Sequence, residues 1–305
     1  MKKDQEIPYN YNSLSELHRM LGLPQPLHPL ISLINNSDNS LNTGDLSHSH
    51  TSVFYKISYK QHLSGKLKYG QHYYDFDEGG MFFVAPGQVT AQSENNSDHS
   101  GYTLIVHPDF LLSYQLAKKI KQYGFFSYAA NEALHLSLKE KETIVTIFKL
   151  IGDELKNRID DFSQDVIISQ LESLLNYSNR FYKRQFITRK AVTDSLLQKL
   201  EEILKDCFSD EKLSMYGVPT VQYLSEQLHL SPGYLSDMLR TLTGQNAQQH
   251  IQNILIEKAK EKLSTTDLSV SEIAYEFGFE HSQSFSRLFK AKTHFSPLAF
   301  RRSFN

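Results

Sequence analysis

The spacing of hydrophobic residues changes along the chain and divides it into three stretches. Between residues 27 and 107, short runs rich in β-branched and aromatic side chains alternate roughly with polar ones, most clearly over residues 52–59. Glycines such as Gly65 and Gly70 separate these runs. Short strands at this spacing predict a barrel or a sandwich, with further strands over residues 73–76, 81–85 and 102–106.

After His107-Pro108 the hydrophobic spacing becomes helical. Apolar residues recur at steps of three and four from Phe110 onward, again around Ile144, and again around Leu171. Residues 109–181 are therefore predicted to form a helical subdomain of three helices. A basic connector over residues 182–193 follows, and short capped helices are expected from Asp194 to the end.

An internal repeat is the strongest signal in the sequence. The apolar positions of the two copies fit a helix, a tight turn and a second helix, so a helix-turn-helix motif is predicted twice. Adding 49 to the positions of Val221, Leu224, Ser225, Leu228 and Leu230 gives Val270, Ile273, Ala274, Phe277 and Phe279. An offset of 50 relates Leu235, Ser236, Leu239 and Arg240 to Phe285, Ser286, Phe289 and Lys290.

Turn and cap residues agree with this repeat. Ser269 and Glu272 form a predicted capping box, and Gly278 lies where a positive φ is expected. Ser231-Pro232 predicts an N-cap followed by proline at the first helical position, whereas His281 at the equivalent place is a weaker cap. His229 replaces the turn glycine in the first motif, which makes that turn less ideal.

One long helix, from about Asn246 to Ser264, is predicted between the two motifs. About eighteen residues span roughly 27 Å at the usual helical rise. Such a strut can hold two recognition helices about one DNA turn apart, near 34 Å.

These residues resemble the AraC/XylS family of transcription regulators. The resemblance is carried by residues 270–279 and 285–290, then by Ser296-Pro297 and Phe300-Arg301, and is strong over residues 194–305. It is weaker over 27–107, which resembles the family's cupin-type sensor barrel, and over 109–181, which resembles its helical dimerisation segment. The implied fold is α+β: an N-terminal cupin-like β-barrel with its arm over 1–108, a dimerisation segment over 109–181, a basic linker over 182–193 and an all-α DNA-binding domain over 194–305.

The second helix of each motif has one face that packs into the core and one that remains free. Leu235, Met238 and Leu239 are predicted to point inward in the first motif, as are Phe285, Leu288 and Phe289 in the second. Arg and Gln can make bidentate contacts with base edges, and the resemblance places base contacts on these same free faces. The predicted DNA-binding residues are Gly233, Ser236, Asp237 and Arg240 in the first motif, and Ser282, Gln283, Ser286, Arg287 and Lys290 in the second.

Asp237 departs from this picture, because phosphates repel a carboxylate. It either accepts from a cytosine amino group or pairs with Arg240 on the next turn of the helix. Arg301 and Arg302 are predicted to face phosphate or solvent.

Composition places the chain among cytoplasmic proteins. It has 305 residues, 40% of them hydrophobic, but its apolar runs are too short to span a bilayer. No apolar stretch follows Met1, and the single Cys207 indicates a reducing compartment. The net charge of −2 is unlike that of many DNA-binding proteins. Residues 281–305 and 178–193 nevertheless hold several cations and no carboxylate, and a local positive face suffices for phosphate contact.

His48 and His50 form an H-x-H pair of the kind found in metal-binding cupins. The next carboxylate is Asp75, and His62 and His72 stand alone, so loop histidines without a metal are the favoured interpretation. No metal or cofactor is expected. A barrel mouth rich in Tyr and Phe suits a small apolar or planar ligand.

Together these observations predict a sequence-specific DNA-binding transcription regulator that responds to a small-molecule effector and is not an enzyme. Its expected partners are double-stranded DNA, RNA polymerase and a second copy of the chain, with no membrane contact. Two alternatives remain open, a cupin-type metal-dependent enzyme with an accessory helical domain and an adaptor that has lost DNA binding. Dimerisation is predicted through an apolar stripe of Val166, Leu171, Leu174 and Leu175.

Overall fold

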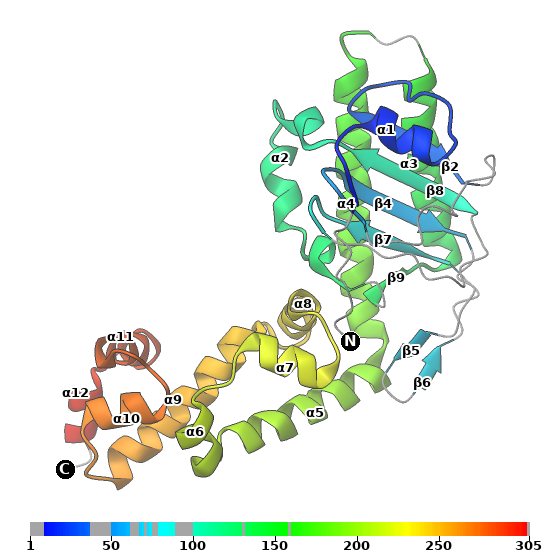
Figure 1. The fold of residues 1–305 in the computed structure, drawn as a ribbon. Coiled ribbons are helices and arrows are strands. Elements are labelled where there is room, and N and C mark those ends of the chain that lie inside the picture. Colours follow the sequence, from blue (N-terminus) through cyan, green and yellow to red (C-terminus); the bar gives the residue numbers. More distant parts are fainter. Residues whose placement is uncertain are drawn as a thin grey trace, which may run out of the picture. The chain divides into compact units, whose positions relative to one another are not determined.

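The computed structural model describes residues 9–36, 50–61, 67–69, 72–74, 79–88, 100–129, 132–157 and 160–303. The chain forms two compact units, Met1–Gln185 and Phe186–Asn305. The N-terminal unit combines a sheet with helices and the C-terminal unit is helical, which confirms the mixed helix-and-sheet class (Figure 1).

An antiparallel sheet forms the centre of the N-terminal unit. Its strands lie in the order β2 (Ile31–Asn35), β8 (Gly101–Val106), β4 (Tyr55–Lys60), β7 (Gly80–Val84) and β9 (Leu134–His135). Leu33 lies opposite Leu104, which lies opposite Ile57. Because successive side chains point to opposite faces of a sheet, these three apolar residues share one face.

Two long helices cover that face, α3 (Leu138–Lys156) and α4 (Ser163–Thr188). The ring of Tyr102 stacks on Phe148 of α3 with the ring centroids 5.6 Å apart. A Cβ on Gly152 would lie 2.8 Å from Leu33 Cδ2, so α3 approaches β2 closely only because this residue is glycine. Ser178 of α4 lies against Met81 of β7.

The opposite face of the sheet carries α1 (Leu14–Met20) and a short parallel pair, β1 (Tyr9–Tyr11) with β3 (His50–Ser52). Tyr11, Leu14, Phe54, Ile34 and Ile105 are buried together there. A separate hairpin joins β5 (Leu67–Tyr69) to β6 (His72–Tyr74).

The predicted closed barrel is wrong for the part of the chain that the structure describes. The five-stranded sheet is open, with β2 and β9 at its two edges and no pairing between them. Short strands of alternating apolar and polar residues are compatible with both a closed barrel and an open sheet. That alternation does not indicate that α3 and α4 pack on one whole face of the sheet. The likeness to a cupin remains a prediction.

The helical stretch after β8 begins with short turns: η2 (Pro108–Leu111), α2 (Leu116–Lys119), η3 (Ile120–Gln122) and η4 (Gly124–Ser127).

The residues of the predicted apolar stripe on α4 differ in their exposure. Leu171, Leu174 and Leu175 are fully buried and only Val166 is exposed, at 41%. The stripe prediction is therefore wrong for the three leucines, because these residues form the core of the unit. Residues 182–193 lie within α4 and α5 except for Arg189.

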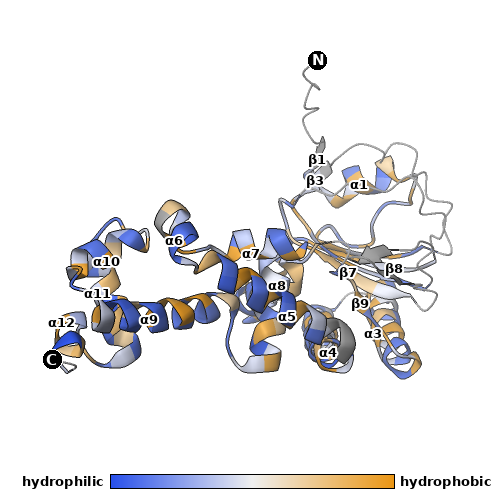
Figure 2. Cartoon of the chain, turned by 90° about the horizontal axis from the view of Figure 1, so that it is seen from below, coloured by the Kyte–Doolittle hydropathy of each residue, from blue (hydrophilic) through white to orange (hydrophobic). Residues whose placement is uncertain are grey.

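The C-terminal unit contains eight helices among its described residues, in addition to the last turn of α4. Hydrophobic and hydrophilic positions alternate visibly along α9 in Figure 2. No described helix combines the length and the apolar character needed to cross a membrane. The helices are α5 (Lys190–Cys207), α6 (Asp210–Tyr216), α7 (Val221–Leu228), α8 (Pro232–Thr243), α9 (Ala247–Thr265), α10 (Val270–Glu276), α11 (Ser282–Thr293) and α12 (Pro297–Arg302).

Candidate nucleic-acid interface

Two helix-turn-helix motifs are present where the repeat predicts them, α7–α8 and α10–α11. Gly278 has φ 76° at the second turn, and His229 adopts the left-handed conformation, φ 56°, at the first. Ser231 caps α8, and Ser269 and Glu272 form the reciprocal capping box of α10. His281 makes no side-chain cap bond, which confirms that it is the weaker cap.

The core faces of α8 and α11 are buried almost as predicted. Leu235, Met238 and Leu239 are at most 2% exposed, and Phe285 and Phe289 are fully buried. Leu288 is only half-buried, so the inward assignment holds for it in part. Aromatic rings, including the edge-to-face pair of the half-buried Phe279 and the buried Phe285, anchor α11 against the turn that follows α10.

The nine predicted DNA-binding residues all lie outside this core. Spacing of three and four along each helix puts them on one face, opposite the buried residues. Arg240, Gln283, Arg287 and Lys290 are exposed, and Gly233, Ser236, Asp237, Ser282 and Ser286 are half-buried.

The charge balance differs between the two faces. On α8 the carboxylate of Asp237 accepts from the guanidinium of Arg240 at 2.9 Å, which confirms the intrahelical pairing among the two alternatives for Asp237. The side chains are 29% and 56% exposed, so solvent weakens the pair. Arg240 therefore presents a partly neutralised cation to an approaching phosphate.

On α11 the cations are not engaged in this way. Arg287 and Lys290 are exposed, and neither makes a hydrogen bond or ion pair with any other described residue. The nearby Lys292 donates to Asn253 of α9 at 3.3 Å. The α11 face thus combines an amide, Gln283, with two unpaired cations, which is the donor set that reads base edges and phosphates.

Arg301 has a different role from the one predicted. Its Nε donates to the carbonyl of Leu263 at 3.1 Å, and its Nη2 donates to the carbonyl of Leu268 at 2.5 Å. These bonds attach α12 to the end of α9, so the prediction that Arg301 faces phosphate or solvent is wrong. Arg302 is exposed.

The strut α9 fixes both motifs. Its N-terminus has a capping box between Asn246 and Gln249, and its 19 residues span about 28 Å. Near its other end, Lys262 Nζ lies 2.8 Å from Glu276 Oε2 of α10 and 3.6 Å from Asp210 Oδ1 of α6. The hydrogen bond to Glu276 raises the pKa of Lys262. One half-buried cation thereby ties helices from both halves of the domain to the strut.

A close contact of two glycines adds to this connection. Gly217 ends α6 with φ 69°, and a Cβ placed on it would lie 3.2 Å from the Cα of Gly278. A Cβ on Gly278 would meet Gly217 in the same way. The segment before the first motif therefore packs directly against the turn of the second, which restricts the spacing of the two recognition helices. Sequence reasoning assigned Gly278 to turn geometry alone and missed both Gly217 and Lys262.

The repeat also extends further than the sequence analysis recognised. Thr243 and Thr293 each donate to the carbonyl four residues before and accept the amide two residues after. Gly244 and His294 both follow with positive φ, 78° and 65°. Asn246 and Ser296 then cap α9 and α12. The offset of 50 that relates Arg240 to Lys290 holds across this segment and could have revealed it.

The proposed histidine site of the N-terminal unit lies mostly outside the described residues. His48, His62 and Asp75 are outside them, and the side chains of His50 and His72 are not described. Among the described residues, no group of three His, Cys, Asp or Glu side chains is placed to hold a metal ion.

Two helix-turn-helix motifs on a shared helical strut define a DNA-binding protein. Residues 224–303 match a protein-family model described as a helix-turn-helix domain. The chain is 26% identical over 266 residues to the HTH-type transcriptional regulator YfiF of Bacillus subtilis, covering 86% of this chain and 80% of that protein. It is 24% identical over 263 residues to the HTH-type transcriptional activator RhaS of Salmonella dublin, covering 83% and 87%. The DNA-binding domain of AdpA, solved in complex with a target DNA, is 26% identical and covers 34% of this chain and 91% of that one, with a TM-score of 0.30.

Residues 224–303 therefore form a helix-turn-helix domain of the AraC type, and the chain is similar over most of its length to HTH-type transcriptional regulators. Its function is sequence-specific DNA binding that regulates transcription.

Proposed function

We propose that α8 and α11 are the recognition helices and that each enters a major groove on the same side of the duplex. In this proposal the DNA-contacting residues are those on the free faces: Gly233, Ser236, Asp237, Arg240, Ser282, Gln283, Ser286, Arg287 and Lys290. The observation that carries the proposal is the face of α11. There an amide and two cations without partners among the described residues lie opposite a buried aromatic core.

The two motifs have unequal roles in this proposal. α11 determines most of the sequence preference, because Gln283 and Arg287 are available for bidentate contacts. α8 adds a weaker contact, because Arg240 must rearrange around Asp237 before it meets a phosphate. The strut and the Lys262 contacts support a fixed spacing between the two half-sites.

Selection of bound sites from random DNA tests the assignment. Sites selected by the unchanged chain should contain two conserved blocks about one helical turn apart. Sites selected by an Arg287→Ala variant should lose preference at one or two base pairs of one block only. A matched Arg302→Ala variant removes an exposed cation from the same region and should leave both blocks intact.

We further propose that the N-terminal unit binds a small-molecule effector and, through residues 109–181, mediates homodimerisation. Residues 1–108 form the sensor in this proposal, residues 182–193 connect it to the DNA-binding domain of 194–305, and the protein acts in the cytoplasm with RNA polymerase as a partner and no enzymatic activity. Val166 supports the dimer proposal, since it is the member of the predicted stripe that remains exposed. A Val166→Glu variant should sediment as a monomer, whereas a dimeric variant would place the interface elsewhere.

A further inference from the structure

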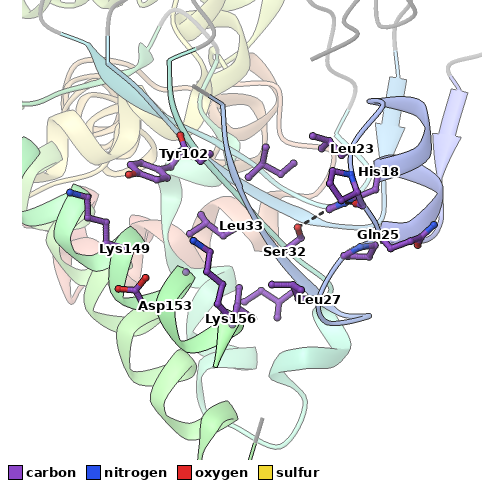
Figure 3. A pocket seen from close by; sticks show the side chains of 17 residues that line it. His18, Leu23, Gln25, Leu27, Ser32, Leu33, Tyr102, Lys149, Asp153 and Lys156 are labelled. Carbon is purple, nitrogen blue, oxygen red and sulfur yellow. Dashed lines mark hydrogen bonds between the residues drawn. The ribbon is translucent and has the colours of Figure 1, made fainter. Parts of the chain in front are cut away.

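A half-open cavity of about 370 Å³ lies along the outer edge of β2 in the N-terminal unit (Figure 3). Residues 23–27 form one of its walls and α3 forms the other. Among the described strands β2 pairs only with β8, so its second edge opens into this cavity. Open strand edges are sites where a further strand can pair.

The main chain of β2 presents hydrogen-bonding groups along this edge. The amide of Asn36 donates to Gly101 at 2.9 Å, and the carbonyl of Leu30 accepts from His107 at 2.7 Å. Hydrogen-bonded pairs alternate along an antiparallel ladder, so the groups of Ile31 and Leu33 point away from β8. Ile31 is fully buried, so the edge is accessible at the half-buried Leu33, whose amide has no hydrogen-bond partner among the described residues.

The two walls differ in chemistry. The wall beside α1 is apolar at Leu23 and Leu27, and there Ser32 is held by a 2.8 Å hydrogen bond to the buried His18. The α3 wall carries Lys149 and Lys156, two turns or about 10 Å apart along the helix, with Asp153 between them. None of these three charges is paired with another of them in the described chain, so the α3 wall has an excess of one positive charge (Figure 3).

We propose that this edge binds a short extended peptide, which adds as a strand next to β2. Alternate side chains of an added strand point to opposite faces. One set would therefore meet the apolar wall and the other would meet Lys149 and Lys156, which favours a peptide of alternating apolar and acidic residues. Residues two apart in a strand lie about 6.6 Å from each other, within reach of two flexible lysines whose Cα atoms are about 10 Å apart.

The occupant is a free peptide of a few residues and not a second copy of the chain. The amide of Leu33 lies at the open edge between the walls, and the cavity volume suits a small ligand. Main-chain hydrogen bonds supply affinity in such added strands, and the side-chain pockets supply specificity.

Calorimetric titration of the full chain with a blocked hexapeptide of alternating Val and Glu tests the proposal. Binding should weaken at least tenfold when Lys replaces Glu in the peptide, and at least tenfold when alternate amides are N-methylated. The variant Lys149→Gln/Lys156→Gln should also lose at least tenfold in affinity. The variant Lys139→Gln/Lys141→Gln removes the same charge from the same helix, away from the cavity, and should bind normally.

Several results would overturn the proposal. Equal binding of the N-methylated peptide would exclude strand pairing, and equal losses in the two lysine variants would exclude a site at this wall. Absence of binding at millimolar peptide would exclude the site altogether. Self-association that disappears in the Lys149→Gln/Lys156→Gln variant would assign the edge to a second copy instead.

The peptide site does not depend on the proposed sensor function. Only an effect of the bound peptide on DNA affinity rests on that function. Peptide binding is measured without DNA, and operator affinity is measured separately with and without peptide. A chain that binds the peptide while its operator affinity stays constant supports the site and contradicts its coupling to DNA binding.

Discussion

Replacement of Arg287 by alanine separates base reading from phosphate contact on α11. Arg287 is exposed and makes no ion pair with a described residue, so its removal breaks nothing inside the domain. The core of the motif is formed by Phe285 and Phe289, which the substitution does not touch. Thermal stability should therefore be unchanged, and any loss of DNA affinity reports the contact with DNA.

The expected cost follows from the type of contact. A bidentate contact between an arginine and a guanine contributes about 1–3 kcal/mol, which is about five- to 140-fold in affinity. That loss should be confined to sites with the preferred base, so the preference at one or two base pairs relaxes. Lys290→Ala should instead weaken all sequences alike and lower the slope of log affinity against log salt by about one.

Arg240→Ala is the matched control for the first motif. Arg240 occupies the equivalent position to Lys290 but is paired with Asp237, and exposed pairs of this kind contribute about 0.2–1 kcal/mol. Its loss should therefore affect DNA affinity less than that of Lys290. Competition assays on randomised sites, at salt concentrations from about 50 to 200 mM, distinguish these outcomes. If Arg287→Ala lowers affinity uniformly and leaves the preferred sequence unchanged, Arg287 only positions the protein and the assignment of specificity to α11 is wrong.

Three further predictions concern other parts of the C-terminal unit. Asp237→Ala should tighten non-specific DNA binding in a filter assay, because it releases Arg240 and removes a repelling charge; weaker binding at one sequence alone would show that Asp237 reads a cytosine. A fragment of residues 186–305 should be more heat-stable than one of residues 194–305, because the longer fragment keeps the edge-to-face contact of Phe186 with Tyr234 at 5.0 Å; equal melting temperatures would refute this. His294→Gly should stabilise the chain by about 0.5–1 kcal/mol in urea unfolding, since φ is 65° there, whereas Gly244→Ala at the equivalent position should destabilise it.

The sequence predicted the C-terminal unit in detail because its signals are local. Caps such as Ser269 and helix breaks such as Gly278 act through residues three or four positions away, and the repeat supplies each signal twice. The boundaries of α9 were therefore predicted to within one residue. Arg301 was assigned wrongly because its partners, the carbonyls of Leu263 and Leu268, lie more than thirty positions away.

The N-terminal unit was predicted less well for the same physical reason. Alternating residues in β4 and β8 identify strands, but which strands lie at the edges depends on pairings between distant segments. Leu171, Leu174 and Leu175 have the spacing of a helix face, and the sequence does not state whether a sheet or a second chain covers them. The cavity beside β2 combines residues from α1, β2 and α3, so no local pattern could indicate it.

The contacts around Lys262 and Gly217 connect these observations to DNA recognition. A flexible pair of motifs would tolerate different distances between two half-sites, whereas a rigid pair accepts one distance and any other requires deformation of the DNA. Here Lys262 binds carboxylates of α6 and α10, and the Gly217–Gly278 contact leaves no room for a side chain. Sequence choice by this chain therefore has two sources. In the proposed function, one is the set of side chains on α11, and the other is the separation of α8 and α11, which would select DNA by the spacing of its half-sites and by how readily it bends.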